Sequence, residues 1–391
     1  SINLILQLRG LPRLVCVVRC GGASRRRSRI VPTGCRIPDV MPYLASAAEA
    51  VESGAVAAGP PNLMRFAAFL PFLDREPAMM PLVTRMVELP ATATELGLSE
   101  LLVKDEGQQP SGSLKARPSA LAAACARFRG FETIACASSG NAAISVAAAA
   151  SAEGLRAVTF VSQAIPAAKL ARLRFHGPQV VVVEGTYAEA YERCEAACAE
   201  YGWFNRNCGQ NPLLIEGKKT CGLEIAEQTS ARPPDWVVVP VGDGCTIAGI
   251  WKGLHEALAT GLAPSAPRML AVQAEGSAVI ADAWRERRPP EEVEPRYARP
   301  VTCADSIAVS HPRSATKAIA AILASGGSAL TVSDHAIAAA RDELRRAGID
   351  VELASAATLA GLRFAVEAGV VAAGSRVVVV GTATGSEQPG R

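Results

Sequence analysis

The sequence predicts an α/β protein built on parallel sheets with right-handed crossovers. From about residue 101 onward, short runs of β-branched residues alternate with alanine-rich helical stretches. Gly, Pro, Asn or Ser marks each change from one pattern to the other. Most of the short runs are apolar without alternation, which is typical of strands that are buried on both faces of a parallel sheet.

The expected strands are short apolar runs that stop at turn residues. The run 101–104 stops at an Asp-Glu-Gly turn, the run 237–241 stops at a Gly-Asp-Gly turn, and the last run is mostly valine. In chain order, we expect strands over 101–104, 133–137, 157–161, 180–183, 237–241, 269–274 and 376–380.

The expected helices are alanine-rich segments between those strands, preceded by one helix that Gly54 ends. In chain order, we expect helices over 42–53, 115–128, 141–152, 167–175, 187–201, 217–228, 247–259, 314–324, 334–347 and 355–368. The first sixty residues otherwise show only weak periodicity and contain an arginine cluster.

The composition fits a globular chain with a large core. Of 391 residues, 49% are hydrophobic and 20% are charged. The net charge is +3, from 40 basic and 37 acidic side chains, which gives no electrostatic case for a nucleic-acid or membrane partner. Eleven scattered cysteines and the lack of a long apolar run predict reduced thiols in a cytoplasmic protein.

Three segments contain residues that could take part in catalysis or ligand binding. In the first, residues 104–115 leave a buried strand and place Lys115 at the start of a helix. Burial and the positive end of a helix dipole both disfavour an ammonium, so Lys115 is a candidate Schiff-base nucleophile. The alternative interpretation is an ordinary solvated lysine in the first helical turn.

The second segment, Ser138-Ser139-Gly140-Asn141, connects an expected strand to an expected helix. Its hydroxyls and free backbone N–H groups suit a carboxylate or phosphate, although Ser and Asn are also ordinary capping residues. The third segment, from Val241 through Gly242, Asp243, Gly244, Cys245 and Thr246, is a glycine-rich loop that enters a helix. Such a loop can hold a phosphate on its backbone amides.

Taken together, these motifs resemble the fold-type II pyridoxal-phosphate enzymes, and within them the threonine synthase family. Besides the three segments, the chain has Asn-Pro followed by Glu-Gly-Lys-Lys-Thr at 211–220, and an apolar strand followed by Thr382. The resemblance covers about 63–385. It implies two doubly wound α/β lobes that hold pyridoxal 5'-phosphate between them.

The resemblance also implies roles for individual residues. Lys115 matches the lysine that bonds to the cofactor and moves protons during the reaction. Asn141 matches the amide on the phenolic oxygen, and Thr382 matches the hydroxyl that faces the ring nitrogen. Ser138 and Ser139 match the loop for the substrate carboxylate. Gly242, Asp243, Gly244, Cys245 and Thr246 match the cradle for the cofactor phosphate, and His311 lies in a loop of the kind that borders the substrate.

Several positions depart from the family pattern. Lys115 is followed by Ala116-Arg117-Pro118, where the family often has Asp-Arg-Gly. Leu214 stands where enzymes that use O-phosphohomoserine commonly have an arginine for the substrate phosphate. Lys218, Arg206 and Arg313 are the cations that we consider as replacements. Cys16, Cys20 and Cys35 resemble an eroded zinc ribbon, but zinc requires four ligands, so we expect no metal.

The expected organisation is an N-terminal extension over 1–60, a large lobe over 61–122 and 200–391, and a small inserted lobe over 123–199. The leading hypothesis is a lyase that converts O-phosphohomoserine and water to threonine and phosphate, as a homodimer. Leu214 favours a second hypothesis, β-elimination or β-replacement on a serine or threonine derivative. A third is a cofactor-holding regulator without catalytic activity.

Overall fold

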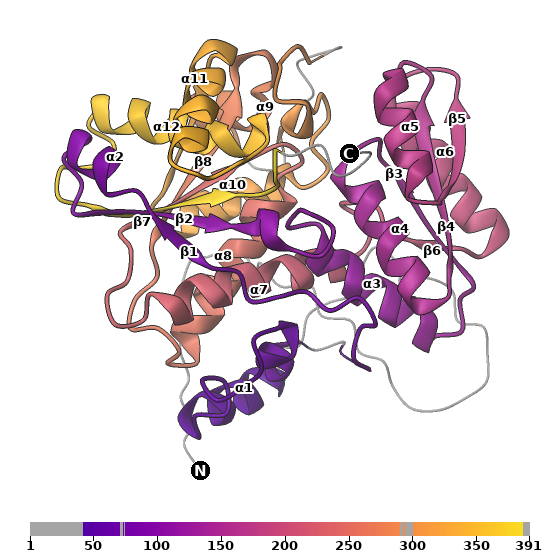
Figure 1. Cartoon of the computed structure of the whole chain (residues 1–391), viewed down its shortest axis with the longest axis horizontal. Coiled ribbons are helices and arrows are strands. Elements are labelled where there is room, and N and C mark those ends of the chain that lie inside the picture. The colour runs from indigo at the N-terminus through magenta and orange to yellow at the C-terminus, as the bar shows by residue number, and fades with distance from the viewer. Residues whose placement is uncertain (1–41, 71–72, 74, 290–291, 294–299, 386–391) are drawn as a thin grey trace.

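A computed structural model describes residues 42–70, 73, 75–289, 292–293 and 300–385. Two α/β lobes lie side by side in it, each with its own sheet (Figure 1). The predicted α/β class with parallel sheets is therefore confirmed. The cysteines Cys16, Cys20 and Cys35 lie outside the described residues, and no disulfide joins cysteines within them.

The larger sheet has six strands in the order β1-β2-β10-β7-β8-β9. All neighbouring strands are parallel except β1, which runs antiparallel to β2. The C-terminal strand β10 lies inside the sheet, with Val378 between Leu102 of β2 and Val237 of β7. The bounds are β1 Met86–Glu88, β2 Glu100–Asp105, β7 Trp236–Pro240, β8 Arg268–Ala274, β9 Ser328–Val332 and β10 Arg376–Gly381.

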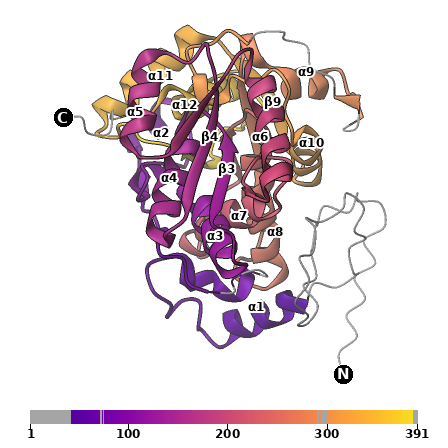
Figure 2. The same ribbon diagram turned by 90° about the vertical axis from the view of Figure 1, so that its right-hand side faces the viewer.

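The smaller sheet has four parallel strands in the order β5-β4-β3-β6. Helices α4 and α5 lie on one face of it, and α6 lies on the other face (Figure 2). The strands are β3 Thr133–Ala137, β4 Arg156–Ser162, β5 Gln179–Val183 and β6 Phe204–Asn205. The helices are α4 Asn141–Glu153, α5 Ala167–Phe175 and α6 Tyr187–Tyr201.

All expected strands and helices are present, with shifts of up to four residues at their ends. Helix α7 begins at Leu213 instead of at residue 217. Strands β1, β6 and β9 and helices α2 and α9 were not predicted from the sequence. The remaining helices are α1 Pro42–Glu52, α2 Pro90–Glu95, α3 Ala116–Phe128, α7 Leu213–Gln228, α8 Cys245–Ala259, α9 Val279–Arg285, α10 Ala315–Ala324, α11 Asp334–Arg346 and α12 Leu353–Glu367.

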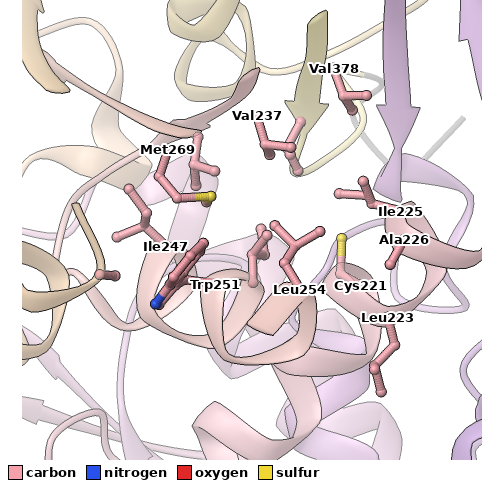
Figure 3. Close-up of a cluster of buried hydrophobic side chains, with 14 of the residues drawn as sticks. Cys221, Leu223, Ile225, Ala226, Val237, Ile247, Trp251, Leu254, Met269 and Val378 are labelled. Atoms are coloured by element: carbon pink, nitrogen blue, oxygen red, sulfur yellow. The ribbon is translucent and has the colours of Figure 1, made fainter. Parts of the chain in front are cut away.

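Helices α7 and α8 cover one face of the larger sheet through a close mutual contact. A Cβ atom added at Gly253 would lie 2.0 Å from the backbone oxygen of Lys219, so only glycine permits this approach. Side chains of both helices, including Cys221 and Trp251, then pack with Met269 and Val378 of the sheet in one buried cluster (Figure 3). This packing fixes the ends of α7 and α8, where the candidate site lies. Among the described residues, no helix has both the length and the apolarity that a membrane crossing requires.

Candidate functional site

The predicted site loops follow the carboxyl ends of parallel strands, where open α/β sheets place their ligands. Lys115 follows β2 and caps α3, and the segment 138–141 follows β3 of the smaller sheet. Gly244 caps α8 after β7, and Thr382 follows β10. Residues from both lobes therefore contribute to the candidate site.

The loop before Lys115 is paired with the end of β10. The backbone N–H of Leu114 donates to the carbonyl of Thr382 at 2.9 Å, and that of Thr384 donates to the carbonyl of Gly112 at 3.0 Å. The Thr382 hydroxyl lies 3.1 Å from the Ser355 hydroxyl, which also accepts the Ala383 N–H at 3.0 Å. These bonds hold Lys115 and Thr382 at neighbouring positions.

Lys115 has a lowered pKa. Burial is the largest cause, and repulsion from Lys218 and Arg206 lowers it further, against attraction from the thiol of Cys208. The structure thus favours an amine that is readily kept neutral over the alternative of a solvated first-turn lysine. The sequence motif identified Lys115. Its two cationic neighbours come from elsewhere in the chain, Lys218 from α7 and Arg206 from the loop after β6.

At the start of α4, the N–H groups of Ser139, Asn141 and Ala142 have no acceptor among the described residues. The cap residue is Gly140, and no side chain caps the helix, so the alternative of ordinary Ser or Asn capping does not hold. The Ser138 hydroxyl accepts the Gly140 N–H at 3.2 Å, and Asn141 donates through Nδ2 to Glu352 at 2.9 Å. All residues of the segment 138–141 are partly exposed, which leaves them accessible to a ligand.

The glycine-rich loop is held by the start of α10. The backbone N–H of Ser314 donates to the Asp243 carbonyl at 2.9 Å, and that of Arg313 donates to Asp243 Oδ1 at 3.2 Å. Gly244 has a φ of +88°, and a Cβ there would lie 2.7 Å from the Ser314 oxygen. Within the described residues, no acceptor meets the N–H groups of Gly242, Asp243 or Gly244. The loop therefore presents free amides to an anion.

A cluster at the ends of α7 and α8 completes this side of the site. The Lys218 Nζ lies 3.9 Å from the Cys208 sulfur. A hydrogen bond from Cys208 and the charge of Lys218 hold the pKa of the Cys245 thiol well below its usual range, despite burial. Sequence reasoning missed Cys208 and Glu352, because neither belongs to the motifs that placed the other residues.

His311 lies in the loop before α10 and is exposed. Partial burial and repulsion from Arg313 lower its pKa, and the charge of Asp243 opposes this shift. Arg313 stacks on Tyr191 of the smaller lobe, with its guanidinium carbon 4.4 Å from the ring centre. The structure thus brings His311 near the glycine-rich loop, and the charges of Arg313 and Asp243 act on its imidazole in opposite directions.

The other charged residues of the motifs form a buried network that supports the site. Arg117 Nε donates to Glu106 at 2.6 Å, and its Nη1 donates to Glu224 at 2.5 Å. Lys104 Nζ donates to Glu224 at 2.7 Å. The network joins β2, α3 and α7, so these motif residues fix the positions of Lys115 and α7.

Comparison with known proteins agrees with this geometry. The family described as pyridoxal-phosphate dependent enzyme matches residues 79–383. The chain belongs to this family. It is 37% identical to the threonine synthase of Methanocaldococcus jannaschii, over 75% of this chain and 72% of that protein. It is 36% identical to the threonine synthase of Methanosarcina acetivorans, over 82% of this chain and 79% of that protein.

The fold is also similar to solved structures. A threonine deaminase from T.th. superposes with a TM-score of 0.66 at 26% sequence identity, over 79% of this chain and 94% of that one. The expected fold type is therefore confirmed, and the protein is a threonine synthase-like, pyridoxal-phosphate dependent enzyme.

The residues present fit this cofactor. The free amides of Gly242, Asp243 and Gly244 at the start of α8 suit its phosphate, and Lys115 offers an amine with a lowered pKa to its aldehyde. Thr382 provides a neutral hydroxyl. Within the described residues, no cluster of His, Cys, Asp and Glu is arranged to hold a metal ion.

Proposed function

We propose that the protein is a threonine synthase, which converts O-phosphohomoserine and water to threonine and phosphate. The observation that carries this proposal is the joint arrangement of Lys115, the open N-terminus of α4 and the glycine-rich loop before α8. The names of the relatives at 37% and 36% identity support the same activity.

In this proposal, pyridoxal phosphate supplies an electron sink for the charge that develops at the substrate α-carbon. Ser138 and Ser139 orient the substrate carboxylate, and Asn141 donates to the phenolic oxygen of the cofactor. Lys115 removes the α-proton and returns protons to the substrate, which requires a neutral amine. Burial and its cationic neighbours lower the pKa of Lys115 and thereby favour this state.

The remaining residues hold the cofactor in place. The amides of Gly242, Asp243, Gly244, Cys245 and Thr246 receive its phosphate, and the Thr382 hydroxyl faces the ring nitrogen. Ser355 supports this role because it lies 3.1 Å from the Thr382 hydroxyl and limits the directions in which that hydroxyl points.

A second candidate is β-elimination or β-replacement on a serine or threonine derivative. Leu214 favours it, since this fully buried apolar side chain cannot bind a phosphate. Measuring phosphate release from O-phosphohomoserine, O-phosphoserine and O-phosphothreonine separates the two. Threonine formed from O-phosphohomoserine supports the main proposal. Turnover of only the other two compounds supports the alternative, and turnover of none supports a regulator without activity.

The phosphorylated amino acid is the substrate, the protein works in the cytoplasm, and it forms a homodimer. Residues 123–199 form a lobe inserted into a larger one that comprises 61–122 and 200–391. Strands β3, β4 and β5 of the small sheet lie within that insert, whereas its last strand, β6, lies a few residues beyond the proposed boundary. Light scattering of the purified protein tests the dimer.

A further inference from the structure

Two buried cations beside Lys115 have no carboxylate partner among the described residues. Lys218 is 1% exposed and Arg206 is 2% exposed. Within that part of the chain, the Lys218 ammonium has only sulfur partners, Cys208 at 3.9 Å and Cys245. Arg206 donates through Nη2 to the Ser119 hydroxyl at 3.1 Å, and its buried Nε has no hydrogen-bond partner there.

The other buried cations that the structure describes do have carboxylate partners, and Arg376 binds Glu100. Lys104 and Arg117 bind Glu224 at 2.7 and 2.5 Å. Lys219 and Lys252 bind Glu216 at 2.5 and 2.6 Å. Lys218 instead faces the thiols of Cys208 and Cys245, and Arg206 faces a serine hydroxyl. Because burying a charge without a carboxylate partner is costly, these two cations are suited to an anion from outside.

The nearby acids are already engaged. Asp243 accepts the backbone N–H of Arg313 at 3.2 Å, and Glu352 accepts from Asn141 at 2.9 Å and from Ser306 at 3.1 Å. In the described part of the chain, neither acid lies within ion-pair distance of Lys218 or Arg206, although the charge of Lys218 opposes the raised pKa of Asp243. The two cations therefore have unused capacity for charge-assisted hydrogen bonds.

The position of Lys218 on α7 relates it to the missing arginine. Leu214 and Lys218 are four residues apart and so lie on the same face of the helix, one turn from each other. Gly249 of α8 allows the close contact at this turn, because a Cβ there would lie 2.7 Å from the Lys218 Cβ. Enzymes that use O-phosphohomoserine commonly have an arginine for the substrate phosphate where this chain has Leu214, and Lys218 offers a cation one turn further along.

We propose that Lys218 and Arg206 bind the phosphate of the amino-acid substrate beside Lys115. This inference rests on the proposed function and assigns its phosphate-binding residues. A planar guanidinium and a point-charge ammonium together offer donors in several directions, as the oxygens of a phosphate monoester require. We assign the subsite to Lys218 and Arg206 and not to Arg313, because Arg313 is more exposed and its guanidinium is held against the Tyr191 ring.

The test compares Lys218→Gln and Arg206→Gln with the wild type, all loaded with pyridoxal phosphate. Each loss of a charge-assisted contact should raise the KM for O-phosphohomoserine about ten- to a hundredfold. Inorganic phosphate, titrated calorimetrically into the holoenzyme, should bind more weakly by a similar factor. Cofactor absorbance after dialysis should stay unchanged. Arg232→Gln, which removes an exposed cation far from the site, is the matched control.

Two further variants, which retain or restore a cation, test the proposal even if a glutamine variant folds poorly. Lys218→Arg retains the charge and should keep a KM near the wild-type value. Leu214→Arg should restore binding when combined with Lys218→Gln, because it returns a cation to the same helix face. Unchanged KM and phosphate affinity in both glutamine variants would overturn the proposal. So would a loss of cofactor with an unchanged KM, because the cations would then serve the cofactor phosphate.

The calorimetric measurement of phosphate binding tests this inference independently of the proposed activity. If the wild type does not convert O-phosphohomoserine but binds inorganic phosphate through Lys218 and Arg206, the proposed function fails and the subsite remains. If it makes threonine and neither cation affects phosphate binding, the function stands and the subsite is wrong.

Discussion

Asn141 and Glu352 join the two lobes at the candidate site through a hydrogen bond of 2.9 Å from the amide nitrogen to the carboxylate. Asn141 starts α4 beside the smaller sheet, and Glu352 precedes α12 beside the larger one. The same carboxylate oxygen accepts from the Ser306 hydroxyl at 3.1 Å. A carboxylate only accepts hydrogen bonds, so Glu352 fixes which end of the Asn141 amide faces it.

Glu352→Gln should therefore weaken the cofactor site. Glutamine can present either end of its own amide to Asn141, so the second N–H of Asn141 loses its fixed direction. We expect cofactor affinity to fall about tenfold or more, the usual effect of losing a hydrogen bond to a charged group. Equilibrium dialysis with absorbance detection measures it.

Glu343→Gln is the control for that change, since Glu343 is a half-buried acid that binds Arg363 away from the site. Equal cofactor affinity in the wild type and in Glu352→Gln would show that Asn141 needs no such support.

Lys115 should be the residue to which the cofactor is attached. The purified protein should be yellow, and borohydride reduction should leave the cofactor on the peptide that contains Lys115, as measured by mass spectrometry. Lys115→Ala should abolish this attachment and catalysis, because no other side chain in the site loops offers an amine in the same position. Attachment to Lys218 after reduction would contradict the assignment.

Gly244→Ala should impair cofactor retention. Its φ of +88° disfavours any side chain, and the added Cβ would lie 2.7 Å from the Ser314 oxygen, which pushes the loop away from α10. Gly261→Ala is a matched control, because Gly261 has a φ of +78° and open space around its Cβ. Retention of the cofactor after dialysis should fall for Gly244→Ala alone, whereas equal retention in both variants would show that the loop is only a turn.

The sequence predicted the elements whose residues are buried and apolar. Strands such as β3 and β7 are completely buried, and their turn residues mark their ends. Three strands escaped prediction for identifiable reasons. β1 and β6 have only three and two residues, and β9 is partly exposed and polar at its start. Helix and strand propensities say little about such short or mixed segments.

The site loops were predictable because each one is continuous in sequence. Glu352 and Cys208 were not, because tertiary packing alone brings them to those loops. In the sequence, Lys218 is only one of three cations that could replace the arginine. Its burial beside Lys115 distinguishes it from Arg313, and no spacing in the chain encodes that difference.

Asp243 gives a prediction about pH. Burial and the Cys208 thiol raise its pKa from 3.8 to about 6, although the Arg313 N–H and the charges of Lys218 and Lys115 oppose this. The folded state then binds this proton more tightly than the unfolded state does. Ionised Asp243 therefore destabilises the fold, and this penalty grows as the pH rises from about 4 to about 6 and is complete above that range.

Asp243→Asn should consequently raise the melting temperature of the cofactor-free protein at about pH 7 and leave it nearly unchanged at about pH 4. The asparagine oxygen can still accept the Arg313 N–H, which lies 3.2 Å from Oδ1 in the wild type. One pKa unit corresponds to about 1.4 kcal/mol, so about 3 kcal/mol is an upper limit that partial exposure reduces. Calorimetry across this pH range measures the effect, with the exposed Asp342→Asn as control. A constant difference between the wild type and Asp243→Asn at every pH would contradict the raised pKa, because a carboxyl that titrates in this range must produce a stability gap that closes as the pH falls.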